Sequence, residues 1–354
     1  MSQRTLSQDP KIELKNLKTG SWILLFVYLT ISMIAAWQFV LPYLAERHYR
    51  EGFNLSAMAR YAYAKDELEE AVQDAPWESL YQMEWGKNLE LLAGETQNPT
   101  EKVQLLLKAE SIYSRMIQLD DQNPWYRNRL ATVYFSLSEM IPAKRTEYLS
   151  LSEQCTKKAA EVDAKNPLFQ LNYAYFLHRL ARFDEAEAYY RTVIRMDTRI
   201  CEAHFNLADI LKRRGDTAGM IQEYETIYEI NPDFNGIRLA LGSIYMQNKD
   251  YDKAIPLFQE ELVQNPSNIQ VWDALIGLYQ HQNAWTAALP FLEAQNKANP
   301  ANVKAMGAYA QALLATQQPY KAYTVMEGYL RFDPYNQAVI EQINRLKKGL
   351  NIQS

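Results

Sequence analysis

Apolar residues recur through most of this chain at the three- and four-residue spacing that is typical of amphipathic helices. The pattern of residues 248–266 returns in residues 282–300, with a proline at the same place in each, Pro256 and then Pro290. Four further prolines, each preceded by Asn or Asp, follow one another at intervals of 34 residues: Pro232, Pro266, Pro300 and Pro334. A strict period of this length predicts a repeat array.

Residues 167–336 divide into five regular units of 34 residues without a gap. Positions 8 and 20 are small in most units, and position 24 is bulky. In unit order, position 8 holds Ala174, Ala208, Gly242, Ile276 and Ala310, position 20 holds Ala186, Met220, Ala254, Ala288 and Ala322, and position 24 holds Tyr190, Tyr224, Phe258, Leu292 and Met326. Small residues let two antiparallel helices approach closely, and the bulky residue fills the space beyond them.

This arrangement resembles the tetratricopeptide repeat (TPR), a helix–turn–helix unit of 34 residues. The resemblance covers residues 45–350 and implies an all-α TPR superhelical solenoid that serves as a protein-interaction scaffold. We expect the second helix of each unit to begin near position 18. Pro256 and Pro290 would then fall in the first turn of that helix, where a missing N–H costs little.

The repeat phase continues on both sides of the regular units. Residues 45–166 contain three divergent TPR-like units, the second and third with insertions around residues 93–101 and 138–147. Residues 337–354 are predicted to form a capping helix and a tail. A solenoid needs such a helix, with one polar face, to cover its last repeat.

The N-terminal part differs in kind. After a short tail, residues 1–20, the segment 21–45 carries no charge and is long enough to span a bilayer. We predict a single, uncleaved transmembrane anchor. A cleavable signal peptide would need a small-x-small site, which Tyr43-Leu44-Ala45 does not provide, and a buried helix of a soluble protein is the other alternative.

The orientation of this anchor is not decided by the charges around it. Four basic residues lie on each side, Arg4, Lys11, Lys15 and Lys18 before it and Arg47, Arg50, Arg60 and Lys65 after it. The short tail and its α-amino group favour an inner-membrane protein with the N-terminus inside and the repeats outside, which in a bacterium is the periplasm.

Composition excludes several classes of function. The net charge of −5 is spread along the chain, and no basic stripe predicts a nucleic-acid partner. The four histidines are scattered, and no catalytic, metal-binding or phosphate-binding motif is present, so we expect no enzyme activity, cofactor or metal. Cys155 and Cys201 fit neither a metal cluster nor a disulfide framework, although their spacing leaves one bridge open.

A TPR solenoid offers a concave surface lined by the first helix of each unit. Asn at position 6 can bond to the main chain of an extended peptide, aromatic residues add contact area, and cations suit an acidic peptide or a carboxylate terminus. The predicted partner-binding residues are Arg129, Asn172, Tyr175, Arg179, Phe205, Asn206, Lys212 and Arg213. The alternative is structural: Asn is frequent at position 6, and cations near a helix C-terminus favour the helix dipole.

A second resemblance concerns the first three units. The anchor, residues 46–81 and residues 123–134 together resemble the C-terminal TPR tail of bacterial O-antigen ligase and polymerase membrane proteins. The catalytic membrane bundle of that family is absent, so no active-site residue is carried over. The resemblance implies a bacterial envelope location and a polytopic membrane protein as a partner.

These features together predict a non-catalytic, membrane-anchored scaffold that recruits or organises proteins of an envelope assembly or export machine. Two alternatives stay open. One is a periplasmic chaperone-like module near a secretion channel, and the other is an accessory subunit of an enzyme that polymerises or exports surface glycan.

Overall fold

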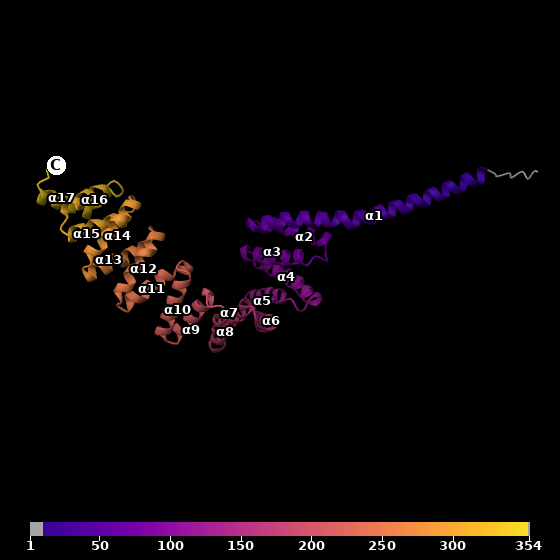
Figure 1. Cartoon of the computed structure of the whole chain (residues 1–354), viewed down its shortest axis with the longest axis horizontal. Coiled ribbons are helices and arrows are strands. Elements are labelled where there is room, and N and C mark those ends of the chain that lie inside the picture. The colour runs from indigo at the N-terminus through magenta and orange to yellow at the C-terminus, as the bar shows by residue number, and fades with distance from the viewer. Residues whose placement is uncertain (1–9, 353–354) are drawn as a thin grey trace, which may run out of the picture. The chain divides into compact units, whose positions relative to one another are not determined.

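The computed structural model describes residues 10–352, and every regular element in that range is helical. The chain divides into two compact units, Met1–Tyr189 and Tyr190–Ser354, and the boundary falls inside one helix (Figure 1). The all-helical fold that the periodicity predicts is therefore confirmed for the described residues.

The first unit is built from helix pairs. The helices are α1 (Pro10–Ala57), α2 (Tyr61–Asp74), α3 (Ser79–Glu95), α4 (Pro99–Leu119), α5 (Pro124–Met140), the 3-10 turn η1 (Pro142–Lys144), α6 (Arg145–Val162), α7 (Pro167–Arg179) and the start of α8 (Phe183–Met196). Leu89, Tyr113 and Leu137 lie at the centre of the α3–α5 core and are fully buried. The insertions lengthen helices and do not form long loops. Helix α4, for example, spans 21 residues.

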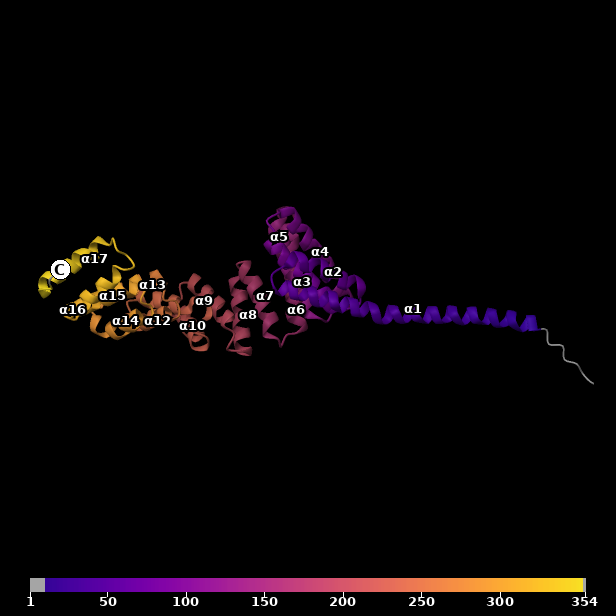
Figure 2. The same cartoon turned by 90° about the horizontal axis from the view of Figure 1, so that it is seen from above.

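Helix α1 has two parts with different surroundings. Its N-terminal part projects beyond the other helices, and residues from Trp22 onward are long and apolar enough to cross a membrane, by length and composition (Figures 1 and 2). Its C-terminal part is the first helix of the repeat array. Ala45 is fully buried there against Ala71, Ala75 and Tyr81. One continuous helix therefore joins the apolar segment to the first repeat.

The second unit follows the same plan. After α8 it contains α9 (Cys201–Arg213), α10 (Thr217–Ile230), the 3-10 turn η2 (Phe234–Gly236), α11 (Ile237–Gln247), α12 (Tyr251–Gln264), α13 (Ile269–Gln282), α14 (Trp285–Ala298), α15 (Val303–Ala315), α16 (Pro319–Tyr329) and α17 (Gln337–Leu350). Ile343 of α17 packs on Ala310 and Met326, while polar residues on the same helix, among them Glu341, Arg345 and Lys348, are exposed. Helix α17 thus covers the apolar side of the last pair.

Asparagine side chains start many of the first helices of the pairs. The side chains of Asn166, Asn268, Asn302 and Asn336 each accept a hydrogen bond from a backbone N–H in the first turn of the helix that follows. Such a cap satisfies donors that would otherwise have no partner in the helix. The recurring Asn therefore marks the start of these four helices.

Contacts between paired helices explain why position 8 is small in most units. A Cβ atom on Gly242 would lie 2.6 Å from the ring of Phe258, which is fully buried on the facing helix α12. In the first unit, a Cβ atom on Gly86 would lie 2.7 Å from the ring of Tyr113. A small residue at one position and a ring at the other are therefore two sides of one close contact.

The expectation for the two repeated prolines was wrong. Helix α12 begins at Tyr251 and α14 at Trp285, so Pro256 and Pro290 are each the sixth helical residue, beyond the first turn. Each proline removes the N–H that the carbonyl four residues earlier would accept. Both prolines lie on exposed faces, as do the residues four earlier, so water can hydrate the freed carbonyls.

The two cysteines are both free. Cys155 lies on α6, where burial raises the pKa of its thiol to about 11. Cys201 begins α9 and is buried. The bridge that their spacing left open is therefore not formed.

Candidate peptide-binding pocket

A pocket of ≈ 170 Å³ opens in the first unit between α5, α6 and α7. Its floor is apolar and is made by Ala131, Phe135 and Phe176. Helices α5 and α7 are the first helices of successive pairs, so the pocket lies on the face that a TPR array offers to partners. Three of the predicted binding residues line it: Asn172, Tyr175 and Arg179.

Two asparagines mark one end of this pocket. Nδ2 of Asn172 donates a hydrogen bond to Oδ1 of Asn128, at 2.9 Å, and so links α7 to α5. This bond uses one N–H and one lone pair of the two amides. The remaining amide groups include both N–H bonds of Asn128 and the carbonyl of Asn172. They are the kind of donor and acceptor that pairs with the main chain of an extended peptide.

The other end is occupied by a cation whose charge is balanced. Nη2 of Arg179 lies 3.2 Å from Oε1 of Glu139, and its guanidinium lies 5.0 Å from the centre of the Phe135 ring. Nη1 of Arg179 also contacts the hydroxyl of Tyr175, at 3.5 Å. The ring of Phe135 meets that of Phe176 edge to face, with centroids 6.1 Å apart. This end is therefore aromatic and electrically close to neutral.

Two hydroxyl groups behind the floor are satisfied within the protein. The hydroxyl of Ser152 donates to the carbonyl of Ala131 at 2.8 Å, and that of Thr156 donates to the carbonyl of Ser152 at 2.6 Å. Because these donors are already used, the inner part of the pocket behaves as an apolar surface. A ligand gains most there by burying a hydrocarbon or aromatic side chain.

Arg129 does not join this pocket. Its Nη1 lies 4.0 Å from Oε1 of Glu90 on α3, and the hydroxyl of Tyr113 donates to the same oxygen at 2.6 Å. Burial raises the pKa of Glu90 to about 6, although Tyr113 and Arg129 both oppose that shift. The structure thus separates Arg129 from Asn172, Tyr175 and Arg179 and gives it a partner on the preceding helix pair.

The other predicted residues lie on α9 in the second unit. Phe205 is half-buried and stacks on Tyr224, with ring centroids 5.9 Å apart. Nδ2 of Asn206 donates to the carbonyl of Glu202 in its own helix at 2.7 Å, and Arg213 pairs with Asp209 at 2.7 Å. Lys212 is exposed. Phe205, Asn206 and Arg213 thus have contacts within their own unit.

His204 on the same helix has a different environment. Its Nδ1 lies 2.6 Å from Oε2 of Glu223 and its Nε2 lies 3.0 Å from the carbonyl of Thr198. Both neighbours are acceptors, so both bonds form only when the imidazole carries two protons. Burial opposes that charge, but the hydrogen bonds outweigh it and the pKa of His204 is raised.

Sequence reasoning missed seven of the ten residues that line the pocket: Asn128, Ala131, Thr132, Phe135, Ser152, Thr156 and Phe176. Asn128, Thr132 and Phe135 stand at positions 5, 9 and 12 of the unit that begins at Pro124. They lie on the first helix of that unit, which is the helix expected to line the concave surface, so considering more positions of that helix would have found them. Phe176 stands at position 10 and gives no such signal.

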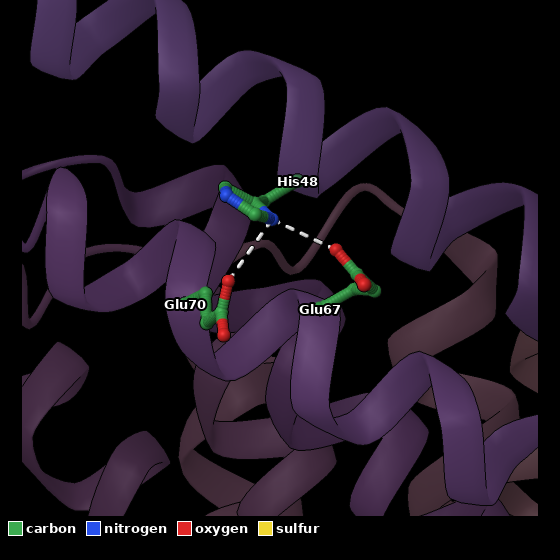
Figure 3. A group of neighbouring side chains, drawn as sticks. All are labelled: His48, Glu67 and Glu70. Atoms are coloured by element: carbon green, nitrogen blue, oxygen red, sulfur yellow. Dashed lines mark hydrogen bonds and ion pairs between the residues drawn. The ribbon is translucent and has the colours of Figure 1, made fainter.

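One side-chain group among the described residues has the composition of a metal site. Nδ1 of His48 lies 2.8 Å from Oε2 of Glu67 and 3.2 Å from Oε2 of Glu70 (Figure 3). Nη2 of Arg47 lies 3.4 Å from Nε2 of His48, and Arg can only donate. The ring proton therefore lies at Nδ1, between the two carboxylates. A divalent cation could be held here only if it displaced that proton.

The comparisons with known proteins agree with this fold. The model of the tetratricopeptide repeat family matches residues 177–233 and 205–269. The Hsp70-Hsp90 organizing protein 1 of Glycine max is 24% identical over 99 residues, which span 28% of this chain and 17% of that protein.

Two solved structures are similar to the chain as well. A thermophilic TPR protein of Thermus thermophilus is 18% identical with a TM-score of 0.45, covering 57% of this chain and 99% of that one. PilF of Pseudomonas aeruginosa is 14% identical with a TM-score of 0.46, and the match covers 69% of this chain and 98% of PilF.

Because both TM-scores lie below 0.5, the class of the chain rests on the matched repeat model and on its own helix pairs. The described residues form successive helix pairs with no other regular element, and residues 177–269 match the TPR family directly. Repeats of this kind generally act as protein-interaction modules, with extended binding surfaces.

Proposed function

We propose that this chain is a non-catalytic, membrane-anchored TPR scaffold that recruits or organises protein partners of a bacterial envelope assembly or export machine. One observation carries the proposal. The apolar part of α1 is exposed along most of its described length, with Trp22 at 70% and Trp37 at 68% exposure, and the same helix continues into the first repeat. An exposed apolar surface of this extent needs a membrane or a protein to cover it.

The length of the segment favours the membrane. Residues 22–41 form 20 residues of helix, and a bilayer core of about 30 Å needs about 20 residues at 1.5 Å each. We propose the inner membrane as the location and the periplasm as the compartment of the repeats. The resemblance of the first three units to the TPR tail of O-antigen ligases supports the same compartment.

The orientation can be tested by labelling in intact cells. Lys348 is exposed on α17, and Lys348→Cys would provide a single thiol once Cys155 and Cys201 are replaced by serine. A thiol reagent that does not cross the inner membrane should label this chain before lysis. Labelling that occurs only after lysis would place the repeats in the cytoplasm and would remove the envelope function.

The pocket on α5, α6 and α7 is the site that we propose for a partner segment. Its free amide groups suit the main chain of an extended peptide, and its aromatic floor suits one apolar side chain of that peptide. Neither feature requires a cofactor or a reaction. The partner is therefore a protein segment that is held, with no chemical change.

A photo-crosslinking residue placed at Thr132 would test the pocket, since that side chain is exposed and lines it. The full chain in its own membrane should give a discrete adduct from this position, and Asn172→Ala should weaken it. The matched control is Ser150, which is exposed on α6 and is not among the residues that line the pocket. Equal adducts from both positions would show that the pocket is not the contact site.

The two alternative functions differ in what the pocket would hold. A chaperone-like module would give many adducts of different mass, because its clients are numerous. An accessory subunit of a glycan-polymerising or glycan-exporting enzyme would give one adduct with a polytopic membrane protein. A scaffold of a soluble assembly would give one or a few soluble partners.

A further inference from the structure

The turn between α2 and α3 carries an apolar patch that the repeat fold does not require. Trp77 is 60% exposed and Leu80 is 52% exposed, and Pro76 between α2 and Trp77 is exposed as well. Exposed apolar residues that occur singly are ordinary on a protein surface. Here a large aromatic and an aliphatic side chain lie together at one corner of the first unit.

Contacts with α1 fix the place of this turn. Ala75 packs with Ala45 in one buried cluster, and the ring of Tyr81 stacks on that of Tyr49 with centroids 4.6 Å apart. The hydroxyl of Tyr81 also donates to Oε2 of Glu46 at 2.7 Å. The turn is thus held beside the stretch of α1 that follows the apolar segment, at the end of α2 from which α1 projects (Figure 1).

The distance along α1 sets the level of the turn relative to a bilayer. If the span ends at Leu41, Ala45 lies four residues further, which is about 6 Å of helix. The headgroup layer adds roughly 5–8 Å to each side of the hydrocarbon core. The turn that packs on Ala45 therefore lies at the depth of the headgroups.

We propose that Trp77 and Leu80 insert into the headgroup layer of the membrane, as a second contact beside the anchor. This inference rests on the membrane anchor proposed above. Trp is enriched at membrane interfaces because its ring is apolar while its N–H is polar. The acids Asp74 and Glu78 flank the patch, so the attraction comes from apolar contact and not from positive charge.

Such a contact would restrain the first repeat. With α1 alone, the first unit could tilt and rotate on a single helix. With the α2–α3 turn also in the interface, two points of the same rigid helix pair meet the membrane. The first repeats, and the pocket three helices further along the chain, would then keep a defined orientation to the bilayer.

The test places an environment-sensitive fluorophore next to the patch while keeping the patch intact. Ser79 is exposed between Trp77 and Leu80, so Ser79→Cys in the full chain without Cys155 and Cys201 provides the labelling site. The labelled protein is reconstituted into phosphatidylcholine vesicles that contain a lipid with a quencher near the headgroup. The matched control is Met58→Cys, which labels an exposed position directly after the end of α1, at the opposite end of the same helix pair and roughly 25 Å beyond Leu41.

We expect blue-shifted emission at position 79, and quenching there roughly twofold or more above that at position 58, because only the former lies at headgroup depth. Trp77→Ala with Leu80→Ser should return the probe at position 79 to an aqueous spectrum. Vesicles with added anionic lipid should give the same result as neutral ones.

Two negative results are distinguishable. If the protein stays with the vesicles after alkaline extraction but the probe at position 79 is aqueous, the interfacial contact is overturned and the anchor stands. If the protein leaves the vesicles on extraction, the anchor itself fails and the contact fails with it.

Discussion

Glu90 allows a quantitative test of the buried contacts in the first unit. Its carboxyl group is packed between Tyr113 and Arg129, and burial raises its pKa from 4.5 to about 6. A carboxyl group with a raised pKa binds its proton more tightly in the folded state than in the unfolded state. Stability is then fully present below the unfolded pKa and is lost as the pH rises through the folded one.

The size of this effect follows from the shift. A difference of about 1.5 pKa units at roughly 1.36 kcal/mol each corresponds to about 2 kcal/mol of unfolding free energy, lost between about pH 4.5 and pH 6.5. Glu90→Gln keeps the shape and most of the hydrogen-bonding capacity of the side chain but cannot titrate. The variant should lack this part of the pH dependence.

The assay is urea unfolding of the full chain in detergent, followed by circular dichroism at several pH values from 4 to 8. The difference between Glu90→Gln and the unaltered chain is the quantity of interest, because other groups titrate in both. Glu95 is exposed at the end of the same helix, so Glu95→Gln is the matched control. An unfolding free energy of Glu90→Gln that falls with pH as steeply as that of the unaltered chain would refute the reasoning.

Two further predictions concern the second unit. Gly242→Ala should lower the unfolding free energy by about 1–2 kcal/mol, because the new Cβ would press on the ring of Phe258. Gly277→Ala should raise the unfolding free energy by up to about 1 kcal/mol, because a Cβ there would meet open space, and thermal unfolding compares the two variants. NMR of the His204 ring should show a pKa above the usual value of about 6.5. The unfolding free energy should fall as the pH rises from about 6.5 through this raised pKa, and His204→Gln should remove that decline. An ordinary or lowered pKa would contradict the pairing of His204 with Glu223.

The sequence was sufficient to predict the all-helical repeat fold because the period repeats one packing contact. The small residue Gly242 and the ring of Phe258 stand at fixed positions of one unit, and the structure places them against each other. The start of a helix is a different matter. The period reveals that Pro256 recurs in the next unit, but not where the helix begins. Helix α12 begins at Tyr251, so Pro256 lies beyond the first turn, and the first turn is where a missing N–H costs little. Exposure to water accounts for that proline, and periodicity does not report exposure.

The candidate site could be predicted only in part, for a related reason. A position within a repeat tells which face of a helix a side chain occupies, and this is sufficient for Asn172 and Tyr175. It does not tell which neighbour a long side chain will reach. Arg129 stands at the same repeat position as Asn172, yet it extends toward the buried carboxylate of Glu90 on another helix pair. Burial of an unpaired carboxylate is costly, and a nearby guanidinium lowers that cost.

The same reasoning changes the chemistry expected of a partner. The cations near the ends of α7 and α9 suggested an acidic peptide, but Arg179 is engaged by Glu139 and Arg213 by Asp209. An acidic ligand would have to displace a carboxylate that is already held close to each guanidinium, and the gain would be only the difference between two similar ion pairs. The apolar floor beside Phe135 has no comparable competitor within the described residues. A peptide that places an apolar side chain on this floor and its main chain along the asparagines therefore gains more than an acidic one does.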